Sequence, residues 1–166
     1  GEPGRELEGA EEAPLGIEGV PPPGSQPPGH LFREIQGLDV FQCVESANLA
    51  RHLNKRADQV LPVFIEVNIA GQESKYGIEP SRTRELARRV CELPKLRLEG
   101  LMTMEPYFQG PEDARPYFRH MRALFERLRE ETLPGARLEV LSMGMTNSYE
   151  VAIEEAPPTD DFGDAP

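Results

Sequence analysis

The chain has 166 residues, including 17 prolines and 15 glycines, and a formal net charge of −11 at pH 7. The acidity belongs to the ends, because residues 1–29 and 154–166 each sum to −5 whereas residues 30–153 sum to −1. We expect no nucleic-acid partner and no membrane, because the chain lacks a basic stripe, an apolar run near the ~18 residues of a membrane span and a signal peptide.

Composition predicts three regions. Residues 1–29 hold seven prolines and seven glycines, and such a segment buries too little apolar surface to offset its chain entropy. We expect it to be disordered or degraded. Residues 30–156 are predicted to form the folded domain, and residues 157–166 an acidic, disordered tail.

The folded region begins with alternating strand and helix patterns. A short apolar run within residues 38–44 predicts a buried strand, and Ser46 is placed to cap a helix over residues 47–57. Residues 61–70, LPVFIEVNIA, give the clearest strand. Their apolar residues run almost without alternation, as in a parallel strand that is covered on both faces.

The same alternation continues to residue 155. It predicts a helix, a strand, the longest helix, a strand and a final helix over residues 81–93, 96–104, 116–128, 136–145 and 147–155. Residues 105–115 are expected to form a long loop, and Pro116 suits the first turn of the helix that follows. Asn147, with Glu150 three residues later, predicts a capping box for the final helix.

This order of elements predicts an α/β fold with parallel strands. A complete (β/α)8 barrel needs about 250 residues, and about four to five β/α units are recognisable here, four of them well defined. We therefore expect a partial (β/α)8 TIM-type barrel, although the pattern alone also permits an open doubly wound sheet. A partial barrel would have open strand edges, which predicts poor stability or self-association.

Function in such folds gathers where the strands end. After the last predicted strand come Ser142, Gly144, Met145, Thr146 and Asn147. A glycine permits close backbone approach, and the start of the next helix offers free N–H groups. The stretch predicts a phosphate cradle. The alternative is that Gly144 only makes a turn and that Asn147 or Ser148 only caps the helix.

Other candidates are less specific. Asn68 and Lys75 follow the second predicted strand, where Asn68 could bond its own loop and Lys75 could be a solvated surface residue. Cys43 and Cys91 form no CxxC pair, and the three histidines show no metal-ligand spacing. We expect reduced cytoplasmic thiols and no metal site.

Four segments together are similar to one known family. They are FIEVNIAGQESKYGI (64–78), LRLEGLMTM (96–104), YFRHMRALFERL (117–128) and LEVLSMGMTNSYEVAIEE (138–155). Over about residues 38–155 the chain resembles the pyridoxal-phosphate homeostasis proteins. The resemblance implies an alanine-racemase-like barrel without the racemase's second domain, and a cytoplasmic protein.

The resemblance also implies a cofactor and its contacts. Family members bind pyridoxal 5′-phosphate through a Schiff base to a lysine at the end of the first strand, and they have no established catalytic turnover. The implied role is to carry or buffer a reactive aldehyde cofactor, so we expect no enzyme. By this resemblance Ser142, Gly144, Met145 and Thr146 fall on the phosphate-side loop, and Asn68 on the ring-side strand end.

The chain departs from the family pattern at both ends. The strand that carries the Schiff-base lysine is not found, and APPTDDFGDAP (156–166) stands where a closing strand with an Arg-Ile-Gly element is expected. We therefore expect impaired or no covalent cofactor binding. Reading-frame errors near residues 3–30 and after 155, or a natural degenerate copy, would explain the departures. The alternative functions are a fold-type III enzyme, such as an amino-acid racemase or decarboxylase, and an inert fragment.

Overall fold

The structure is a computed structural model, and it describes residues 37–72 and 76–157. The predictions made for residues 1–29, for Lys75 and for residues 158–166 lie outside the described residues. Within the described part, no helix is both long enough and apolar enough to cross a bilayer.

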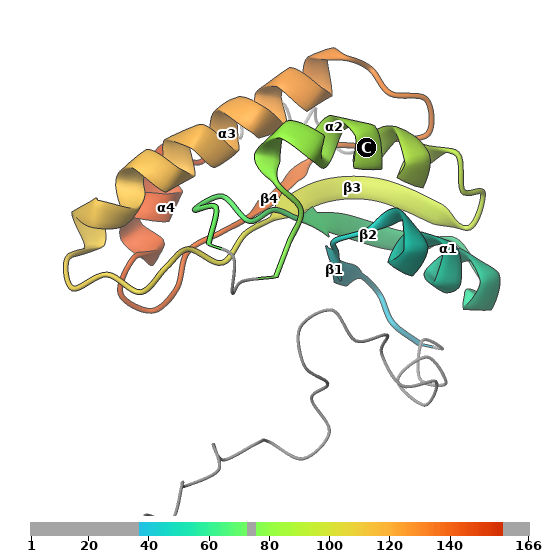
Figure 1. The fold of residues 1–166 in the computed structure, drawn as a ribbon, viewed down its shortest axis with the longest axis horizontal. Helices are drawn as coiled ribbons and strands as arrows, with labels where there is room; N and C mark the ends of the chain where they lie inside the picture. Colours follow the sequence, from blue (N-terminus) through green and yellow to red (C-terminus); the bar gives the residue numbers. More distant parts are fainter. Residues whose placement is uncertain (1–36, 73–75, 158–166) are drawn as a thin grey trace, which may run out of the picture.

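Four strands alternate with four α-helices (Figure 1). The strands are β1 (Phe41–Val44), β2 (Leu61–Glu66), β3 (Leu96–Met102) and β4 (Val140–Ser142). The helices are α1 (Ala47–Arg56), α2 (Pro80–Cys91), α3 (Arg115–Glu130) and α4 (Tyr149–Glu155), with a short 3-10 helix η1 (Pro111–Ala114) before α3.

The strands are all parallel and lie in the order β1-β2-β3-β4. A doubly wound sheet reverses its strand order partway, so the sequential order excludes that alternative. The prediction of a partial (β/α)8 barrel with four parallel β/α units is confirmed.

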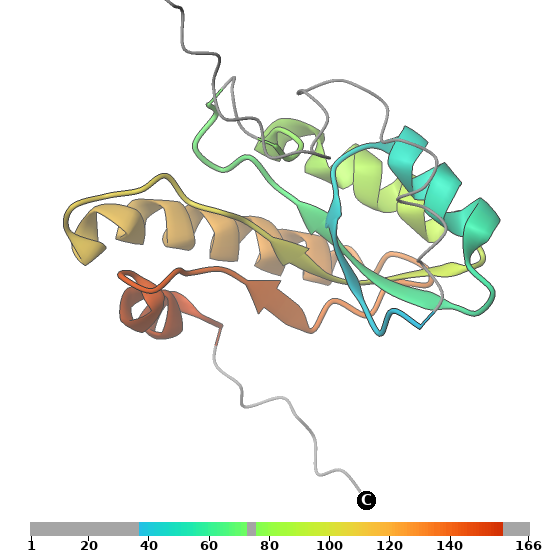
Figure 2. The ribbon, with the colours of Figure 1, turned by 90° about the horizontal axis from the view of Figure 1, so that it is seen from below.

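The sheet is strongly curved. The Ser142 hydroxyl on β4 donates to Gln42 Oε1 on β1 over 3.3 Å, although β2 and β3 lie between these two strands. Side chains of the outermost strands meet across the concave face only if the sheet bends as a barrel does. The helices α1, α2 and α3 lie on the opposite, convex side (Figure 2).

The main core lies between the sheet and these helices. Ser46 caps α1 as predicted, because its side chain accepts a hydrogen bond from the Leu49 N–H over 3.2 Å. Each fully buried large apolar side chain contributes about 1.5–3 kcal/mol. The largest are Val44, Leu53, Val63, Ile65, Val67, Leu98, Leu101, Met121, Phe125 and Leu128.

A bulge explains why β4 is shorter than the predicted strand over residues 136–145. The register of β2 against β3 shifts between Val63 and Phe64. In β3, a Cβ on Gly100 would lie 2.3 Å from the Val140 carbonyl oxygen, so only glycine lets β4 approach here. Regular pairing covers Val140–Ser142 alone, while the N–H groups of Arg137 and Glu139 bond β3 irregularly.

A second, smaller cluster holds α4 against α3. Its buried members are Ala114, Phe118, Val151 and Ala152, and the half-buried Phe108 and Met143 pack on it. Arg115 adds ion pairs to Glu154 and Glu155 at 2.6 and 2.7 Å. These contacts fix α4, and with it the loop that connects β4 to α4.

Candidate functional site

The loops that follow the strands lie together at the carboxyl edge of the sheet, toward the left of Figure 1. The loop between β4 and α4 (residues 143–148) contains most of the predicted site. Gly144 has a φ of 96°, and a Cβ there would lie 2.7 Å from the Ala152 Cβ. Glycine is therefore required both by the backbone conformation and by the close approach of α4.

Ser148 organises this loop. Its hydroxyl accepts a hydrogen bond from the Met145 N–H over 3.0 Å and donates one to the carboxylate of Glu105. The Met145 carbonyl in turn accepts from the N–H groups of Ser148 and Tyr149, at 2.9 Å each. Both Ser148 and Glu105 are buried, so the loop is anchored from its inner side.

The predicted capping box is wrong. Ser148, not Asn147, directly precedes α4, and α4 has no side-chain cap. The Asn147 side chain instead donates to the Phe108 carbonyl over 3.0 Å. The Ser148 hydroxyl bonds Glu105 and Met145, which leaves none of these side chains to close the helix start.

The outer side of the loop offers backbone donors. Among the described residues, no acceptor faces the N–H groups of Thr146 and Asn147, and both residues are exposed. Successive free N–H groups in a turn favour an anion. Because α4 has only seven residues, the turn itself, not a helix dipole, supplies most of this preference. The loop therefore fits a phosphate group.

The structure brings together four of the five predicted site residues. Ser142, Gly144, Met145 and Thr146 follow one another from the end of β4 into the loop. Asn68 lies at the end of β2, with β3 between it and β4. Its side chain forms two hydrogen bonds with the Gln72 backbone, at 2.7 and 3.2 Å. The Asn68 side chain therefore bonds its own loop, which is the alternative that the sequence analysis left open.

The β1–β2 side of the edge is acidic. Glu66 at the end of β2 is 8% exposed, and its burial and the charge of Glu45 raise the pKa of its carboxyl group, while a hydrogen bond from Cys43 lowers it. Burial of the Cys43 thiol, together with Glu66, raises its pKa to about 11, although the residue as a whole is exposed. An anion would meet repulsion on this side.

Replacing Glu66 with glutamine should stabilise the chain at pH 7. The pKa of Glu66 is raised in the folded chain above its ordinary value of 4.5. Ionising Glu66 therefore costs folding free energy, and stability is lost as the pH rises from 4.5 through the folded pKa. The gain of Glu66→Gln should vanish below pH 4.5 and be complete above the folded pKa. Denaturant unfolding across pH measures it.

The same substitution should accelerate alkylation of Cys43 at neutral pH, because the nearby charge that suppresses its thiolate is removed. Cys91 has its own burial-raised pKa and no contact with Glu66, so its alkylation rate is the internal control. A gain in stability from Glu66→Gln that is no larger at pH 7 than at pH 4 would contradict the assigned cause.

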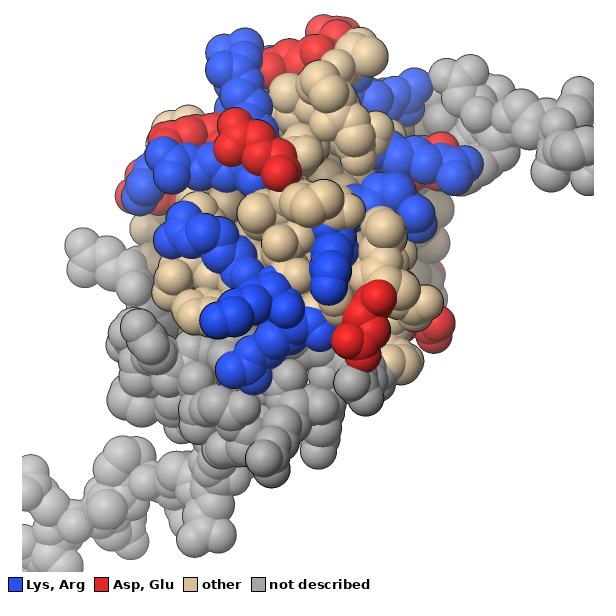
Figure 3. Space-filling model, turned by 90° about the vertical axis from the view of Figure 1, so that its right-hand side faces the viewer, with Lys and Arg blue, Asp and Glu red and all other residues tan. Residues whose placement is uncertain are grey.

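The lysines do not complete the site. Lys55 lies in the last turn of α1 and Lys95 just before β3, so both stand at the amino-terminal ends of the strands. Figure 3 shows Lys and Arg side chains gathered on that opposite end of the molecule. Within residues 37–72 and 76–157 no lysine stands at the carboxyl edge.

The described residues also contain no group of three or more His, Cys, Asp or Glu side chains that could hold a metal ion. Sequence reasoning missed the roles of Glu105, Gln42 and Glu66. Glu105 carried one signal, because it is an isolated acid in the otherwise apolar stretch LMTMEPYF. Gln42 and Glu66 carried no such signal, because their interactions with Ser142 and with Glu45 and Cys43 arise only when the strands come together in the sheet.

Comparisons with known proteins agree with this architecture. A family model described as the alanine racemase N-terminal domain matches residues 23–158. A pyridoxal phosphate homeostasis protein of Aquifex aeolicus is 46% identical over an alignment of 119 residues that covers 70% of this chain and 51% of the relative. The chain spans about half the length of the curated relatives that it matches.

Two solved structures are also similar. An unknown protein from Bifidobacterium adolescentis has a TM-score of 0.71 and 31% identity, covering 76% of this chain and 52% of that chain. PipY of Synechococcus elongatus, with pyridoxal phosphate bound, has a TM-score of 0.64 and 22% identity, covering 75% of this chain and 58% of that chain. At that identity, the likeness to PipY concerns the fold.

The fold and the family match define a domain of the alanine racemase N-terminal type. Within this class, the chain belongs to the pyridoxal phosphate homeostasis protein family.

Proposed function

We propose that this chain is a regulatory pyridoxal 5′-phosphate-binding protein that holds the cofactor mainly by its phosphate group. We further propose that covalent attachment through a lysine is impaired or absent in this chain. The observation that carries the proposal is the β4–α4 loop, where Gly144 has a φ of 96° and where, among the described residues, the N–H groups of the exposed Thr146 and Asn147 have no hydrogen-bond acceptor.

In this proposal Ser142, Gly144, Met145 and Thr146 contact the phosphate. Glu45 and Glu66 repel an anion from the β1–β2 side of the edge, so charge favours the β4 side. Asn68 would border the ring of the cofactor through its backbone, because its side chain closes its own loop. The bound cofactor would supply an aldehyde that reacts with amines, and the chain would position it.

Catalysis is not part of the proposal. The pyridoxal phosphate homeostasis proteins are not an established enzyme family, and a racemase or decarboxylase needs a lysine beside the reacting aldehyde. The carboxyl edge contains none within the described residues. A cytoplasmic location remains the prediction made from the sequence.

Two ligand experiments test the two parts of the proposal. Calorimetry with pyridoxine 5′-phosphate, which lacks the aldehyde, should show binding that inorganic phosphate competes away and that pyridoxine without phosphate does not reproduce. Borohydride reduction with pyridoxal 5′-phosphate, followed by peptide mapping, should label Lys55, Lys75 and Lys95 only partly. None of the three lysines should be labelled to saturation at low cofactor concentration.

Each part can fail separately. A single lysine that saturates at low cofactor concentration, with Lys75 the foremost candidate, would overturn the proposed loss of covalent attachment. Absence of phosphate-dependent binding would overturn the cofactor proposal and favour an inert fragment. Turnover of alanine between its enantiomers would instead support the enzyme alternative.

A further inference from the structure

A buried carboxylate lies behind the loop between β4 and α4. Glu105 follows β3 and is 1% exposed, and its carboxylate accepts a hydrogen bond from the Ser148 hydroxyl. Burying a carboxylate costs free energy even when it is hydrogen-bonded, and a neighbouring site for an anion would raise that cost. An apolar side chain would fill the same space at a lower cost, so packing alone does not account for Glu105.

The Glu105 carboxylate fixes the direction of the Ser148 hydroxyl. A carboxylate only accepts hydrogen bonds, and a serine hydroxyl has one proton to donate. Because that proton points to Glu105, the Ser148 oxygen presents a lone pair to the Met145 N–H, which donates to it over 3.0 Å. Ser148 is itself 4% exposed. Its hydroxyl therefore acts inside the loop and not on its exposed side.

The segment that contains Glu105 holds the loop at a second residue as well. The Asn147 side chain donates to the Phe108 carbonyl over 3.0 Å, and the half-buried Phe108 packs on the smaller core cluster. Glu105 and Phe108 both belong to residues 103–110, which connect β3 to η1. This one segment thus bonds two consecutive residues of the loop, Asn147 and Ser148.

The same segment is fixed to the sheet where it begins. Thr103 is 3% exposed, and its hydroxyl donates to the Val67 carbonyl over 2.7 Å. The Thr103 N–H donates to the Ser142 carbonyl over 3.0 Å. Val67 directly follows β2 and Ser142 ends β4, so Thr103 joins both neighbours of β3. The contacts made by Glu105 therefore start from a fixed backbone.

We propose that Glu105 is a positioning residue of the phosphate site and that it acts through Ser148. Its carboxylate holds the Ser148 oxygen against the Met145 N–H, and this bond fixes the turn that carries the N–H groups of Thr146 and Asn147. Neither Glu105 nor Ser148 touches the ligand. The inference rests on the proposed function, since it specifies how the same loop is kept ready for a phosphate ester.

The sign of one substitution distinguishes positioning from charge. Glu105→Gln removes a negative charge behind the loop, and charge alone would make a phosphate bind more tightly. A glutamine can also turn its NH2 group toward Ser148, where it competes with the Met145 N–H for the hydroxyl oxygen. Positioning therefore predicts that Glu105→Gln weakens binding by about threefold or more.

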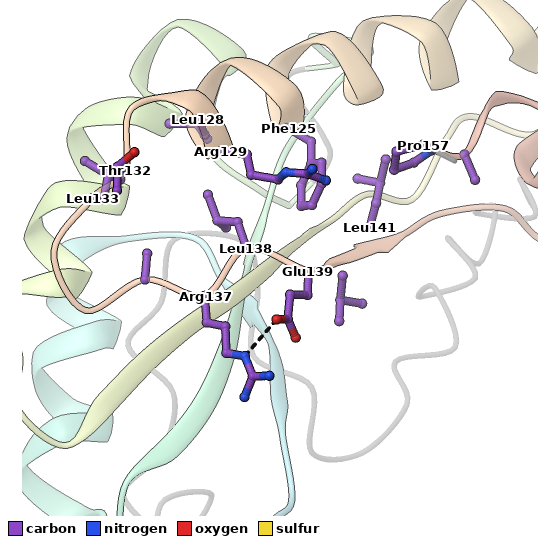
Figure 4. A pocket seen from close by; sticks show the side chains of 13 residues that line it. Phe125, Leu128, Arg129, Thr132, Leu133, Arg137, Leu138, Glu139, Leu141 and Pro157 are labelled. Carbon is purple, nitrogen blue, oxygen red and sulfur yellow. Dashed lines mark hydrogen bonds and ion pairs between the residues drawn. The ribbon is translucent and has the colours of Figure 1, made fainter. Parts of the chain in front are cut away.

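A cavity on another side of β4 provides a matched charge control. It has a volume of about 610 Å³ and lies between β4 and the last turns of α3 (Figure 4). Arg137 and Glu139, which form an ion pair of 2.7 Å, are among the residues that line it, whereas none of residues 143–148 does. Glu139→Gln removes the same charge from an exposed position and should leave phosphate affinity unchanged.

Calorimetric titration of the full chain with pyridoxine 5′-phosphate, alongside urea unfolding, tests the inference. Ser148→Ala should weaken binding about tenfold or more. In the Ser148→Ala background, Glu105→Gln should change affinity no further, because the hydroxyl through which it acts is gone. Thr83→Ala removes another buried hydroxyl, which donates to the Glu79 carbonyl at the start of α2 over 3.1 Å. It should lower stability without changing affinity.

An amide signal reports the same contact without a ligand. Glu105→Gln and Ser148→Ala should each shift the Met145 amide resonance and accelerate its hydrogen exchange, because both weaken the bond from this N–H to the Ser148 oxygen. Thr83→Ala should leave the Met145 amide unchanged.

Failure of this inference and failure of the proposed function give different results. If the unaltered chain binds pyridoxine 5′-phosphate, the positioning role is overturned by unchanged or tighter binding of Glu105→Gln, or by an equal effect of Glu105→Gln with and without the Ser148 hydroxyl. A loss of affinity in Thr83→Ala equal to that in Ser148→Ala would also overturn it. An unaltered chain that does not bind the ligand would overturn the proposed function, and the positioning role with it.

Discussion

Replacing Phe118 with alanine should destabilise the folded chain by about 3–5 kcal/mol, the usual cost of truncating a buried phenylalanine. Phe118 is fully buried between α3 and α4, in the smaller core cluster. The α4 helix has seven residues, too few to be stable alone. Losing Phe118 should therefore release α4 and the loop before it. Urea unfolding measures the global loss.

Hydrogen exchange separates the local effect from the global one. Phe125 on the same helix is equally buried but belongs to the main core, so Phe125→Ala is the matched control. When the two variants are compared under conditions that give them the same global free energy of unfolding, Phe118→Ala should accelerate exchange of the Val151 and Ala152 amides more than Phe125→Ala does. Equal exchange in the two variants would contradict the role assigned to the smaller cluster.

Gly144→Ala should combine two costs. A residue other than glycine at a φ of 96° carries about 1–3 kcal/mol of backbone strain. Its Cβ would also meet the Ala152 Cβ at 2.7 Å, and such overpacking costs a further 1–3 kcal/mol or so. Displacing the loop should also reduce affinity for a phosphate ligand at least about tenfold, if the loop holds that group.

Gly135→Ala is the control for the strain alone. Gly135 has a φ of 81°, and a Cβ there meets nothing closer than 3.8 Å. It precedes β4 at the amino-terminal side of the sheet, away from the candidate site. Gly144→Ala should therefore lose more stability and should alone lose ligand affinity. Equal losses of both quantities in the two variants would contradict the close packing of α4 on Gly144.

Local chemistry predicted most of the elements. The run of β-branched and aromatic residues in LPVFIEVNIA identified β2, Ser46 identified the start of α1, and Pro116 lies in the first turn of α3. In each case the decisive residues lie within a few positions of the element. Such signals depend on backbone preferences that the sequence displays directly.

Three features of the fold depend on contacts between residues that lie far apart in the sequence, and local sequence patterns did not predict them. The close approach of β4 to β3 depends on Gly100 in another strand. The start of α4 depends on a bond from Ser148 to Glu105, 43 positions earlier. The curvature is visible through Gln42 and Ser142, 100 positions apart. No local pattern encodes such pairs.

The candidate site also combines residues that a local pattern predicted with residues that only the folded sheet brings together. The small polar residues after the last strand predicted a site at Ser142, Gly144, Met145 and Thr146, and in the structure these residues lie at the end of β4 and in the loop that follows it. Their role in holding phosphate remains a proposal. The acidic pair of Glu45 and Glu66 was not foreseen, because its members approach each other only when β1 and β2 pair.

The most direct test of phosphate binding by the β4–α4 loop is a titration of the ¹⁵N-labelled chain with pyridoxine 5′-phosphate, followed by amide chemical shifts. This ligand cannot react with lysines, so the shifts report non-covalent contact alone. We predict saturable shifts concentrated at Gly144, Met145, Thr146 and Asn147, which inorganic phosphate competes away. Shifts confined to the basic, amino-terminal end of the strands, or no saturable shifts in the loop, would contradict the account.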